Sequence, residues 1–508
     1  TKSPTAPAVS ESFDSATAPA DTTDIQRNYG VESEEDRPLA TQTTLTVSTY
    51  TADQPTTPDR TLFAQTQVTP DSAIETTVYG AEAAANSAML DLHSNMVRHA
   101  LCQGGGRRRG RSATAPDDTM GSDGDLSFGI EVPEEEERSI PIAPVEPPQP
   151  VDDAEVPFLP EVTDFLWVDQ ARQAFKVNGE GMTVAVLDTG LNTAHVDFAG
   201  RILAQVNFTG DNGGDKNNAN DGNGHGTNVG GIIAAGGNHT GMAPGANIIP
   251  IKVLADQGGG DFRWIDQALQ WVIDNQEEHN ITAVCMSLGD GGNYTSDNFA
   301  IWEFLRNSVR RKIQTLKAKR VAVVIAAGND FFKHKSKQGM GFPAIIRECV
   351  SVGAVYDSDG GGFSYGSGAR SFATKRGQIT PFSQRLHSSV SKDTCTDIFA
   401  PGAPVTASGI GSPTASSTQH GTSQATPVVT GVILLLQEFY HRWQHELPTV
   451  DQLIAWLQSG GVPIYDGDDE NDNVEHTHLT YTRADALSAL DAARRAIQAK
   501  ELAKAMGG

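Results

Sequence analysis

Short apolar runs that alternate with segments of helical periodicity constrain the fold of this chain most strongly. The first run occupies residues 183–187 (Thr-Val-Ala-Val-Leu), and such runs are typical of strands buried on both faces of a parallel sheet. Similar runs follow at residues 248–254, 281–286 and 321–326. Helices are predicted between them, for example over residues 262–275 and 301–317. This alternation predicts a three-layer α/β domain in which helices flank a mostly parallel central sheet.

The bulk properties of the 508-residue chain exclude several classes of function. Its formal net charge of -25 argues against nonspecific binding to nucleic acid or to anionic lipid, which requires clustered positive charge. The sequence has no apolar run near the roughly 18 residues that a membrane-spanning helix needs. No signal peptide is recognisable, but the chain opens with Thr1, so a cytoplasmic location is favoured only slightly over secretion.

The N-terminal part of the chain differs in composition from the rest. Residues 1–155 are dominated by Thr, Ser, Pro, Ala and acidic residues, which bury too little apolar surface to offset the entropy of ordering. We therefore predict a largely disordered, low-complexity segment or propeptide, with a helix near residues 75–101. The arginine cluster at residues 107–111 is a cleavage site, a docking tag or, as we favour, a solvated loop. A globular domain is expected at residues 156–495, followed by a C-terminal tail at 496–508.

A serine that precedes a strongly apolar segment is the first candidate for chemistry. Residues 420–427 read His-Gly-Thr-Ser-Gln-Ala-Thr-Pro, and the apolar residues 428–436 after them are typical of a buried helix. Ser423 is then expected at or just before a helix N-terminus, where unpaired N–H groups and the helix dipole favour negative charge. Pro427 suits the first helical turn, where its missing N–H has no partner to lose. A serine so placed is a candidate nucleophile that needs a base, an orienting acid and an oxyanion donor.

Three other polar residues stand where such partners are expected. Asp188 directly follows the first apolar run, so its carboxylate is expected at the sheet edge where sites form in α/β domains. His225 lies in the glycine-rich stretch 221–227, which leads into a predicted helix of small residues. Asn329 follows the fourth run, and its amide is suited to donate to a developing oxyanion. Taken singly, Asp188 is better explained as a turn-capping residue, His225 as a structural residue and Asn329 as a turn-forming residue.

Together, however, four local sequences resemble motifs of one family, the subtilisin-like serine proteases or subtilases. The matching stretches are Val-Leu-Asp-Thr-Gly at 186–190, Asn-Gly-His-Gly-Thr at 223–227, Ala-Ala-Gly-Asn at 326–329 and Gly-Thr-Ser-Gln-Ala-Thr-Pro at 421–427. Their candidate residues occur in the order Asp, His, Ser, which is the order in subtilisin. The resemblance covers about residues 165–490 and implies a subtilisin-like version of the three-layer fold.

The resemblance implies a serine endopeptidase that hydrolyses peptide bonds through an acyl-enzyme. Ser423 would attack the scissile carbonyl, His225 would transfer the proton, and Asp188 would orient the imidazole. Asn329 and the backbone N–H of Ser423 would hold the oxyanion. A protein or peptide substrate is expected to bind as an extended strand.

Substrate contacts are also implied by the resemblance. The segment that pairs with the substrate backbone and walls the first specificity pocket would consist of Ser287, Leu288 and Gly289. The opposite edge of the cleft, where missing side chains leave room for a peptide, would consist of Gly258, Gly259 and Gly260. The floor of the pocket would be formed by Ala327 and Gly328.

Two residues depart from the family pattern. Gln424 stands where Met usually follows the nucleophile, and Val428 stands where His usually follows the proline. Neither position belongs to the triad, so the departures do not argue against activity. Because Gln424 cannot form a sulfoxide, it predicts a site that is less sensitive to oxidation.

The expected chemistry requires no cofactor. Calcium binding stays open, but no motif in the sequence supports it. The segment 195–197 (His-Val-Asp) resembles one whose Asp binds calcium in many subtilases, but the stretch 236–241 looks too short for the usual ligand loop. The oxygen-rich stretches 211–221 and 466–472 are alternatives, although such stretches are more often solvated loops. No metal-binding residue is therefore assigned.

Two rival functions stay open. A processing peptidase dedicated to one partner, or to its own N-terminal segment, is suggested by the arginines at 107–111. A catalytically silent subtilase-like domain that only binds partners is disfavoured, because all three triad residues are present. The preferred cleavage site and the oligomeric state are not readable from the sequence, since both depend on loop and surface geometry.

Overall fold

The computed structural model describes residues 64–68, 74–78, 141–142 and 158–507, apart from residues 300–302 and 468–469. The strands of the main sheet are β4 Thr183–Asp188, β5 Val206–Asn207, β6 Asn247–Lys252, β8 Ile281–Met286, β9 Ala322–Ala326, β10 Val350–Val355, β13 Ile398–Pro401, β16 Val462–Asp466 and β18 Leu479–Arg483. The minor strands are β1 Ala64–Val68, β2 Ile74–Val78, β3 Pro141–Ile142, β7 Gly260–Asp261, β11 Phe363–Ser364, β12 Arg370–Ala373, β14 Val405–Ser408, β15 Ser416–Gln419 and β17 Asn471–Asp472. The helices are α2 Phe158–Phe165, α3 Val168–Phe175, α4 His225–Ala234, α5 Phe262–Asn275, α6 Glu303–Ala318, α7 Thr422–Gln444, α8 Val450–Ser459 and α9 Ala486–Gly507, with short 3-10 turns η1 Val196–Phe198 and η2 Asn212–Gly214.

The main sheet has nine strands in the order β16-β18-β13-β10-β9-β8-β4-β6-β5. Every neighbouring pair in it is parallel except β16 and β18. Strand β4 therefore lies between β8 and β6, away from the edges of the sheet. The carboxyl ends of the parallel strands meet at one edge, where binding sites form in such sheets.

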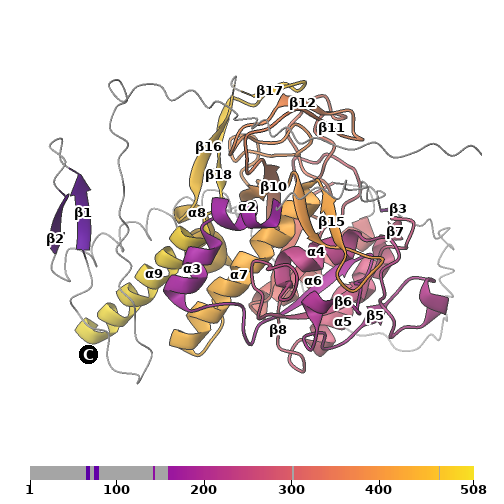
Figure 1. Ribbon diagram of the computed structural model, residues 1–508, viewed down its shortest axis with the longest axis horizontal. Helices are drawn as coiled ribbons and strands as arrows, with labels where there is room; N and C mark the ends of the chain where they lie inside the picture. The colour runs from indigo at the N-terminus through magenta and orange to yellow at the C-terminus, as the bar shows by residue number, and fades with distance from the viewer. Residues whose placement is uncertain are drawn as a thin grey trace, which may run out of the picture. The chain divides into compact units, whose positions relative to one another are not determined.

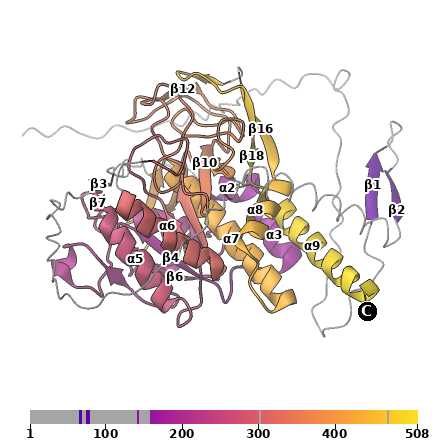
Figure 2. The same cartoon turned by 180° about the vertical axis from the view of Figure 1, so that it is seen from behind.

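Helices cover both faces of this sheet. Helices α5 and α6 lie in front of the sheet in Figure 2, and α4 lies on the opposite side, toward the viewer in Figure 1. The side chains of β4 alternate between the two layers: Val184 and Val186 join the apolar core of α4 and α7, whereas Ala185 and Leu187 join that of α5 and α6. The predicted three-layer arrangement is confirmed, and the uninterrupted apolar run of β4 follows from burial on both faces.

Three predictions about the ends of elements need correction. The helix predicted near residues 75–101 does not include residues 75–78, because β2 pairs antiparallel with β1; the rest of that range lies outside the described residues. The tail predicted at residues 496–508 is not separate, since α9 continues through this boundary to Gly507. Pro427 lies in the second turn of α7, because the helix already begins at Thr422.

The structure also bears on disulfide bonds and on membrane crossing. None of the three described cysteines, Cys285, Cys349 and Cys395, takes part in a disulfide bond. No helix in the described part of the chain combines the length and the apolarity that crossing a lipid bilayer would require.

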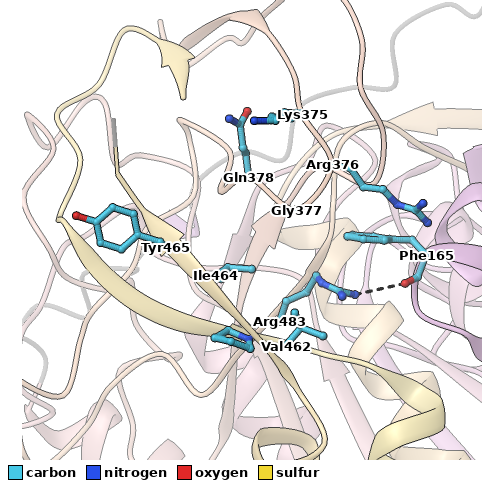
Figure 3. A pocket seen from close by; sticks show the side chains of 10 residues that line it. Phe165, Lys375, Arg376, Gly377, Gln378, Val462, Ile464, Tyr465 and Arg483 are labelled. Atoms are coloured by element: carbon cyan, nitrogen blue, oxygen red, sulfur yellow. Dashed lines mark hydrogen bonds between the residues drawn. The ribbon is translucent and has the colours of Figure 1, made fainter. Parts of the chain in front are cut away.

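The end of α2 docks beside the outer strands of the sheet. The guanidinium carbons of Arg376 and Arg483 lie 4.4 and 4.0 Å from the centre of the Phe165 ring. These distances are within the range of favourable cation–π contacts. Arg483 also donates to the Phe165 carbonyl at 3.4 Å (Figure 3). These residues line an open cleft of about 810 Å³ beside β16. None of the predicted catalytic or substrate-binding residues lines this cleft.

A buried ion pair ties β16 to the loop that contains Arg385. Arg385 donates from Nε to Asp466 Oδ2 at 2.9 Å and from Nη2 to Asp466 Oδ1 at 3.1 Å. Both side chains are about 1% exposed. Burial alone would raise the pKa of Asp466, but Arg385 and hydrogen bonds from His476 and Thr477 lower it to about 2. The carboxylate is therefore charged at neutral pH, and Arg385 depends on it as a counter-ion.

We expect Asp466→Asn to lower the free energy of unfolding by about 3–5 kcal/mol at neutral pH, because Arg385 is left buried without a counter-ion. A lowered pKa stabilises the fold fully above the ordinary Asp pKa, and this contribution is lost as the pH falls toward the folded-state value. Urea unfolding of the wild type and the variant at about pH 7 and about pH 3 measures both effects. The difference between the two proteins should be smaller at the lower pH, and an unchanged difference would contradict this account.

Candidate active site

Asp188 and His225 are brought into direct contact at the carboxyl end of β4. Asp188 is the last residue of β4, His225 is the first residue of α4, and both side chains are buried. Asp188 Oδ1 lies 2.7 Å from His225 Nδ1 and accepts a hydrogen bond from the Thr189 N–H, also at 2.7 Å. In the neutral imidazole this contact requires the proton on Nδ1, so Nε2 carries the lone pair.

The loop before His225 is held by Asp221, a residue that the sequence reasoning did not single out. Its two carboxylate oxygens accept five hydrogen bonds of 2.6 to 2.9 Å, from Thr189 Oγ1, Asn223 N, Gly224 N, Thr227 N and Thr227 Oγ1. Thr189 directly follows Asp188, and Thr227 lies in the first turn of α4. The Asp221 carboxylate therefore ties the turn after β4 to the helix that carries His225. A signal was present, because an Asp that opens a glycine-rich stretch commonly organises a turn.

His225 is surrounded by closely packed backbone, and nearby carboxylates change its pKa. A Cβ on the neighbouring Gly226 would lie 2.3 Å from the Gly190 carbonyl oxygen, so only glycine lets α4 approach the end of β4 this closely. Burial by itself would lower the pKa of His225, but the Asp188 carboxylate, and further away Asp221, raise it above the ordinary value. The site therefore stabilises the protonated imidazole.

Ser423 is the second residue of α7, and two hydrogen bonds join it to Ser287. Ser287 Oγ donates to the Ser423 carbonyl at 2.7 Å, and Ser423 Oγ donates to the Ser287 carbonyl at 3.3 Å. The Ser423 carbonyl accepts this side chain because Pro427, four residues later, has no N–H for the usual helical bond. Among the hydrogen bonds of the described residues, none joins the Ser423 hydroxyl to His225. The structure thus brings Ser423 to the start of α7 with its hydroxyl bonded to Ser287.

Asn329 lies beside the start of α7. Its Oδ1 accepts hydrogen bonds from Thr422 N at 2.8 Å and from Thr422 Oγ1 at 2.9 Å. Its Nδ2 points toward Gly421, where an added Cβ would lie 3.1 Å from it. Gly328 has φ +117°, and a Cβ there would lie 2.0 Å from Gln384 Oε1, so this position requires glycine. Ala327 is fully buried, and its carbonyl accepts from Gly341 N.

The other residues predicted to contact substrate lie in two separate segments, one at residues 287–289 and the other at residues 258–260. Leu288 is 4% exposed, and a Cβ on Gly289 would meet only the Phe342 carbonyl, at 3.5 Å. On the other side, Gly258 and Gly259 form a turn closed by 2.7 Å backbone hydrogen bonds with Ala255. Gly260 starts β7 and pairs antiparallel with β3, in the register Pro141↔Asp261 and Ile142↔Gly260. An extended segment of the same chain therefore adds a strand at this edge.

Buried amides connect the first turns of α4 and α7. The Nε2 atom of Gln424, which is 1% exposed, lies 3.3 Å from both Asn228 Oδ1 and Gln419 Oε1. Asn228 Nδ2 donates to the Ser417 carbonyl at 2.7 Å, and Gln419 Nε2 donates to the Gly224 carbonyl at 3.2 Å. Backbone carbonyls only accept, so they fix both amides with their oxygens toward Gln424. Gln424 must therefore turn its NH2 group toward them.

Three carboxylates in the segments considered for calcium are bound by protein groups. Calcium takes about six to eight oxygen ligands. Asp197 contacts the imidazole groups of two histidines, Asp221 uses both oxygens in the loop described above, and Asp466 is paired with Arg385. In the described residues of the stretches 195–197, 211–221 and 466–472, these three carboxylates are therefore already engaged by protein partners, and no calcium-dependent step is derived.

Comparison with known proteins gives a consistent result. Residues 179–459 match the Subtilase family. The chain is 30% identical over 292 residues to an intracellular serine protease of Paenibacillus polymyxa, covering 57% of this chain and 76% of that protein. It is 36% identical over 183 residues to the major intracellular serine protease of Bacillus subtilis, covering 35% and 52%. An extracellular serine proteinase of Thermus sp. is 30% identical over 274 residues, or 53% of each chain.

We expect the activity of the wild type to survive mild peroxide treatment and that of Gln424→Met to be lost. The variant places an oxidisable thioether beside Ser423, and its sulfoxide would be bulkier and more polar than the thioether. Residual activity is measured after timed exposure to hydrogen peroxide, with oxidation at residue 424 followed by peptide mass spectrometry. Equal loss in both proteins would show that oxidation at this position does not control the activity.

Proposed function

Because this chain belongs to the subtilase family of serine proteases, we propose that it hydrolyses peptide bonds with Asp188, His225 and Ser423 as its catalytic triad. Asn329 and the backbone N–H of Ser423 form the oxyanion hole. The observation that carries this proposal is the 2.7 Å contact between Asp188 Oδ1 and His225 Nδ1. A buried carboxylate that holds Nδ1–H leaves Nε2 as a base, which is the role a triad requires.

The first chemical step begins when the Ser423 hydroxyl leaves the Ser287 carbonyl and turns toward His225 Nε2. Rotation of one side-chain bond is fast compared with typical turnover. His225 then takes the proton while Ser423 Oγ forms a bond to the scissile carbonyl carbon. The raised pKa of His225 favours the imidazolium that results. His225 returns this proton to the leaving amine, and a water molecule later hydrolyses the acyl-enzyme by the same route.

The oxyanion is stabilised at the start of α7. The Ser423 N–H belongs to the first turn of the helix, whose N–H groups have no partner within the helix. Asn329 is held by Thr422 through its Oδ1, so its Nδ2 is pre-oriented as a donor. A fixed donor of this kind contributes more than a flexible one, because it needs no reorganisation during the reaction.

The substrate binds as an extended strand between Ser287-Leu288-Gly289 and Gly258-Gly259-Gly260, over Ala327 and Gly328. The pairing of β3 with β7 supports this mode, since the predicted edge already accepts an antiparallel strand. The same pairing supports a second candidate function, the processing of the chain's own N-terminal segment. Comparing the N-termini of the active protein and of Ser423→Ala by mass spectrometry tests it, and identical, uncut N-termini would exclude self-processing.

A cytoplasmic location is the preferred proposal. Two of the similar proteins are named as intracellular proteases, although the relative from Thermus sp. is named as extracellular. Fractionation of the source cells with an antibody to the folded domain tests this location directly.

The function itself is tested with an acylating or phosphonylating serine-hydrolase probe. We expect the wild type to be labelled at Ser423 and to cleave a protein substrate, and Ser423→Ala to lose both properties. Asn329→Ala should still be labelled slowly, and its kcat should fall by about 10²–10³-fold with little change in KM, because only the oxyanion donor is lost. Labelling of Ser423→Ala at another residue, with activity retained, would exclude the assigned nucleophile. A wild type that is neither labelled nor active would instead favour the silent binding domain.

The pH dependence separates the role of Asp188 from a merely structural one. Asp188 raises the pKa of His225, and only the neutral imidazole acts as a base, so activity should be lost as the pH falls through this raised pKa. We expect Asp188→Asn to move the acidic limb of kcat/KM to lower pH and to lower kcat by about 10⁴-fold. Asp215→Asn, in an exposed loop, is the matched control and should leave the profile unchanged. An acidic limb that stays in place in Asp188→Asn would contradict the assignment.

A further inference from the structure

Two histidines and a carboxylate converge at a place that the proposed triad does not use. Asp197 lies in η1, His195 immediately precedes η1, and His239 lies in the loop after α4. Asp197 Oδ2 is 2.7 Å from His239 Nδ1 and 3.2 Å from His195 Nδ1. The side chains of His195 and Asp197 are 0% exposed, and that of His239 is 14% exposed. We refer to these three residues as the His-Asp-His cluster.

Both imidazole rings of the cluster also form hydrogen bonds through Nε2, the nitrogen that faces away from Asp197, to residues at the start of β15. His195 Nε2 is 2.9 Å from the Ala415 carbonyl, and His239 Nε2 is 2.9 Å from Ser416 Oγ. The ring nitrogens that face Asp197 are the two Nδ1 atoms. Histidines that bind metals characteristically give their second ring nitrogen to a carbonyl, hydroxyl or carboxylate in this way, which fixes the tautomer.

The tautomer of His195 leaves electron-rich atoms facing each other. A carbonyl oxygen only accepts, so the His195 proton lies on Nε2 and the Nδ1 lone pair faces the cluster. The Asp197 N–H approaches this lone pair at 3.2 Å, the long end of hydrogen-bond distances, and it brings no positive charge. A buried lone pair thus stands 3.2 Å from a buried carboxylate oxygen. Such an arrangement is stabilised by a cation.

Among the described residues, no charged side chain other than the two histidines forms a hydrogen bond to the carboxylate, and Arg201 acts on it only through its charge. Ser408 Oγ donates to Asp197 Oδ2 at 2.5 Å, and the His239 N–H donates to Asp197 Oδ1 at 3.0 Å; both donors are neutral. The Arg201 guanidinium bonds to the backbone carbonyls of Asp197 and Ala246. The C-terminal end of α4 is also adjacent, since the Gly236 N–H donates to the Asp197 carbonyl, and the helix dipole favours positive charge there.

We propose that the His-Asp-His cluster binds one divalent transition-metal ion, with zinc as the best match, through His195 Nδ1, Asp197 Oδ2 and His239 Nδ1. Ser416 Oγ can accept as well as donate, so His239 can carry its proton on Nε2 and present Nδ1 to the metal. Two imidazoles and one carboxylate suit zinc. They do not suit calcium, which requires a cage of oxygen atoms.

The bound ion would be structural. It would join η1, the loop after α4 and, through Ser408, strand β14, and β14 and β15 pack on α4 (Figure 1). The ten residues of α4 span about 15 Å, so the ion would anchor one end of the helix whose other end carries His225. Its loss is expected to weaken the fold around α4 more than to alter the chemical step itself.

The proposal is tested on the full chain carrying Ser423→Ala, which prevents self-digestion and makes the result independent of catalysis. The protein is stripped with a chelator, incubated with zinc chloride, separated from free metal and analysed by plasma mass spectrometry. We expect about one zinc ion per chain and a higher unfolding temperature than that of the stripped protein. Cobalt(II) in place of zinc should give the visible absorption of a four-coordinate site with nitrogen ligands.

Variants separate this site from other histidines. His239→Gln keeps an amide near Asp197, and it should weaken zinc binding by more than about tenfold and abolish the zinc-dependent rise in unfolding temperature. His441→Gln, on the exposed end of α7, and His476→Gln, beside the Asp466 carboxylate, should leave both properties unchanged. Equimolar zinc of unaltered affinity in His239→Gln would overturn the proposal. So would loss of zinc in His476→Gln alone, or stabilisation by calcium but not by zinc.

Discussion

The geometry of the candidate site depends on the buried carboxylate of Asp221. It accepts hydrogen bonds from Thr189, on the turn after β4, and from Thr227, in the first turn of α4. Direct hydrogen bonds from His225 to Asp188 and from Gly226 N to Thr189 Oγ1 reinforce this link. The link holds Asp188 and His225 in contact although 37 positions separate them in the sequence. Gly226 completes the arrangement, because any side chain there would collide with the Gly190 carbonyl.

A second set of polar contacts relates α4 to α7, so that three distant segments become one site. Gln424 bonds to Asn228 and Gln419, and Ser287 replaces the hydrogen bond that Pro427 cannot give to the Ser423 carbonyl. Buried amides of this kind stabilise a structure only when their partners are in place. Their orientation here is fixed by two backbone carbonyls. The departure from the family pattern at residue 424 is therefore accommodated by local hydrogen bonding.

Much of the fold could be predicted because the apolar runs have only one reasonable environment. Residues 184–187 are apolar without alternation, and in the structure they contribute to the cores on both faces of the sheet. Helix ends were predicted less well. α7 begins before the position expected from Pro427, and α9 passes through the expected start of the tail. Helix ends depend on tertiary contacts such as that between Ser287 and Ser423, which a local pattern does not contain.

The sequence by itself determined the residue types available for chemistry, their order along the chain, the strands and helices that carry them, and the family resemblance. Only the tertiary structure decided which side chains meet. Asp221 carried only the general signal of an Asp that opens a turn, and the amides of Asn228 and Gln419 carried no distinctive local signal. Their roles appear once α4, α7 and the end of β4 are packed together. The same holds for His195 and His239, which converge on one carboxylate oxygen from the position before η1 and from the loop after α4. Local patterns report burial and backbone preference, whereas hydrogen-bond partners and charge pairs are set by distances between segments far apart in the chain.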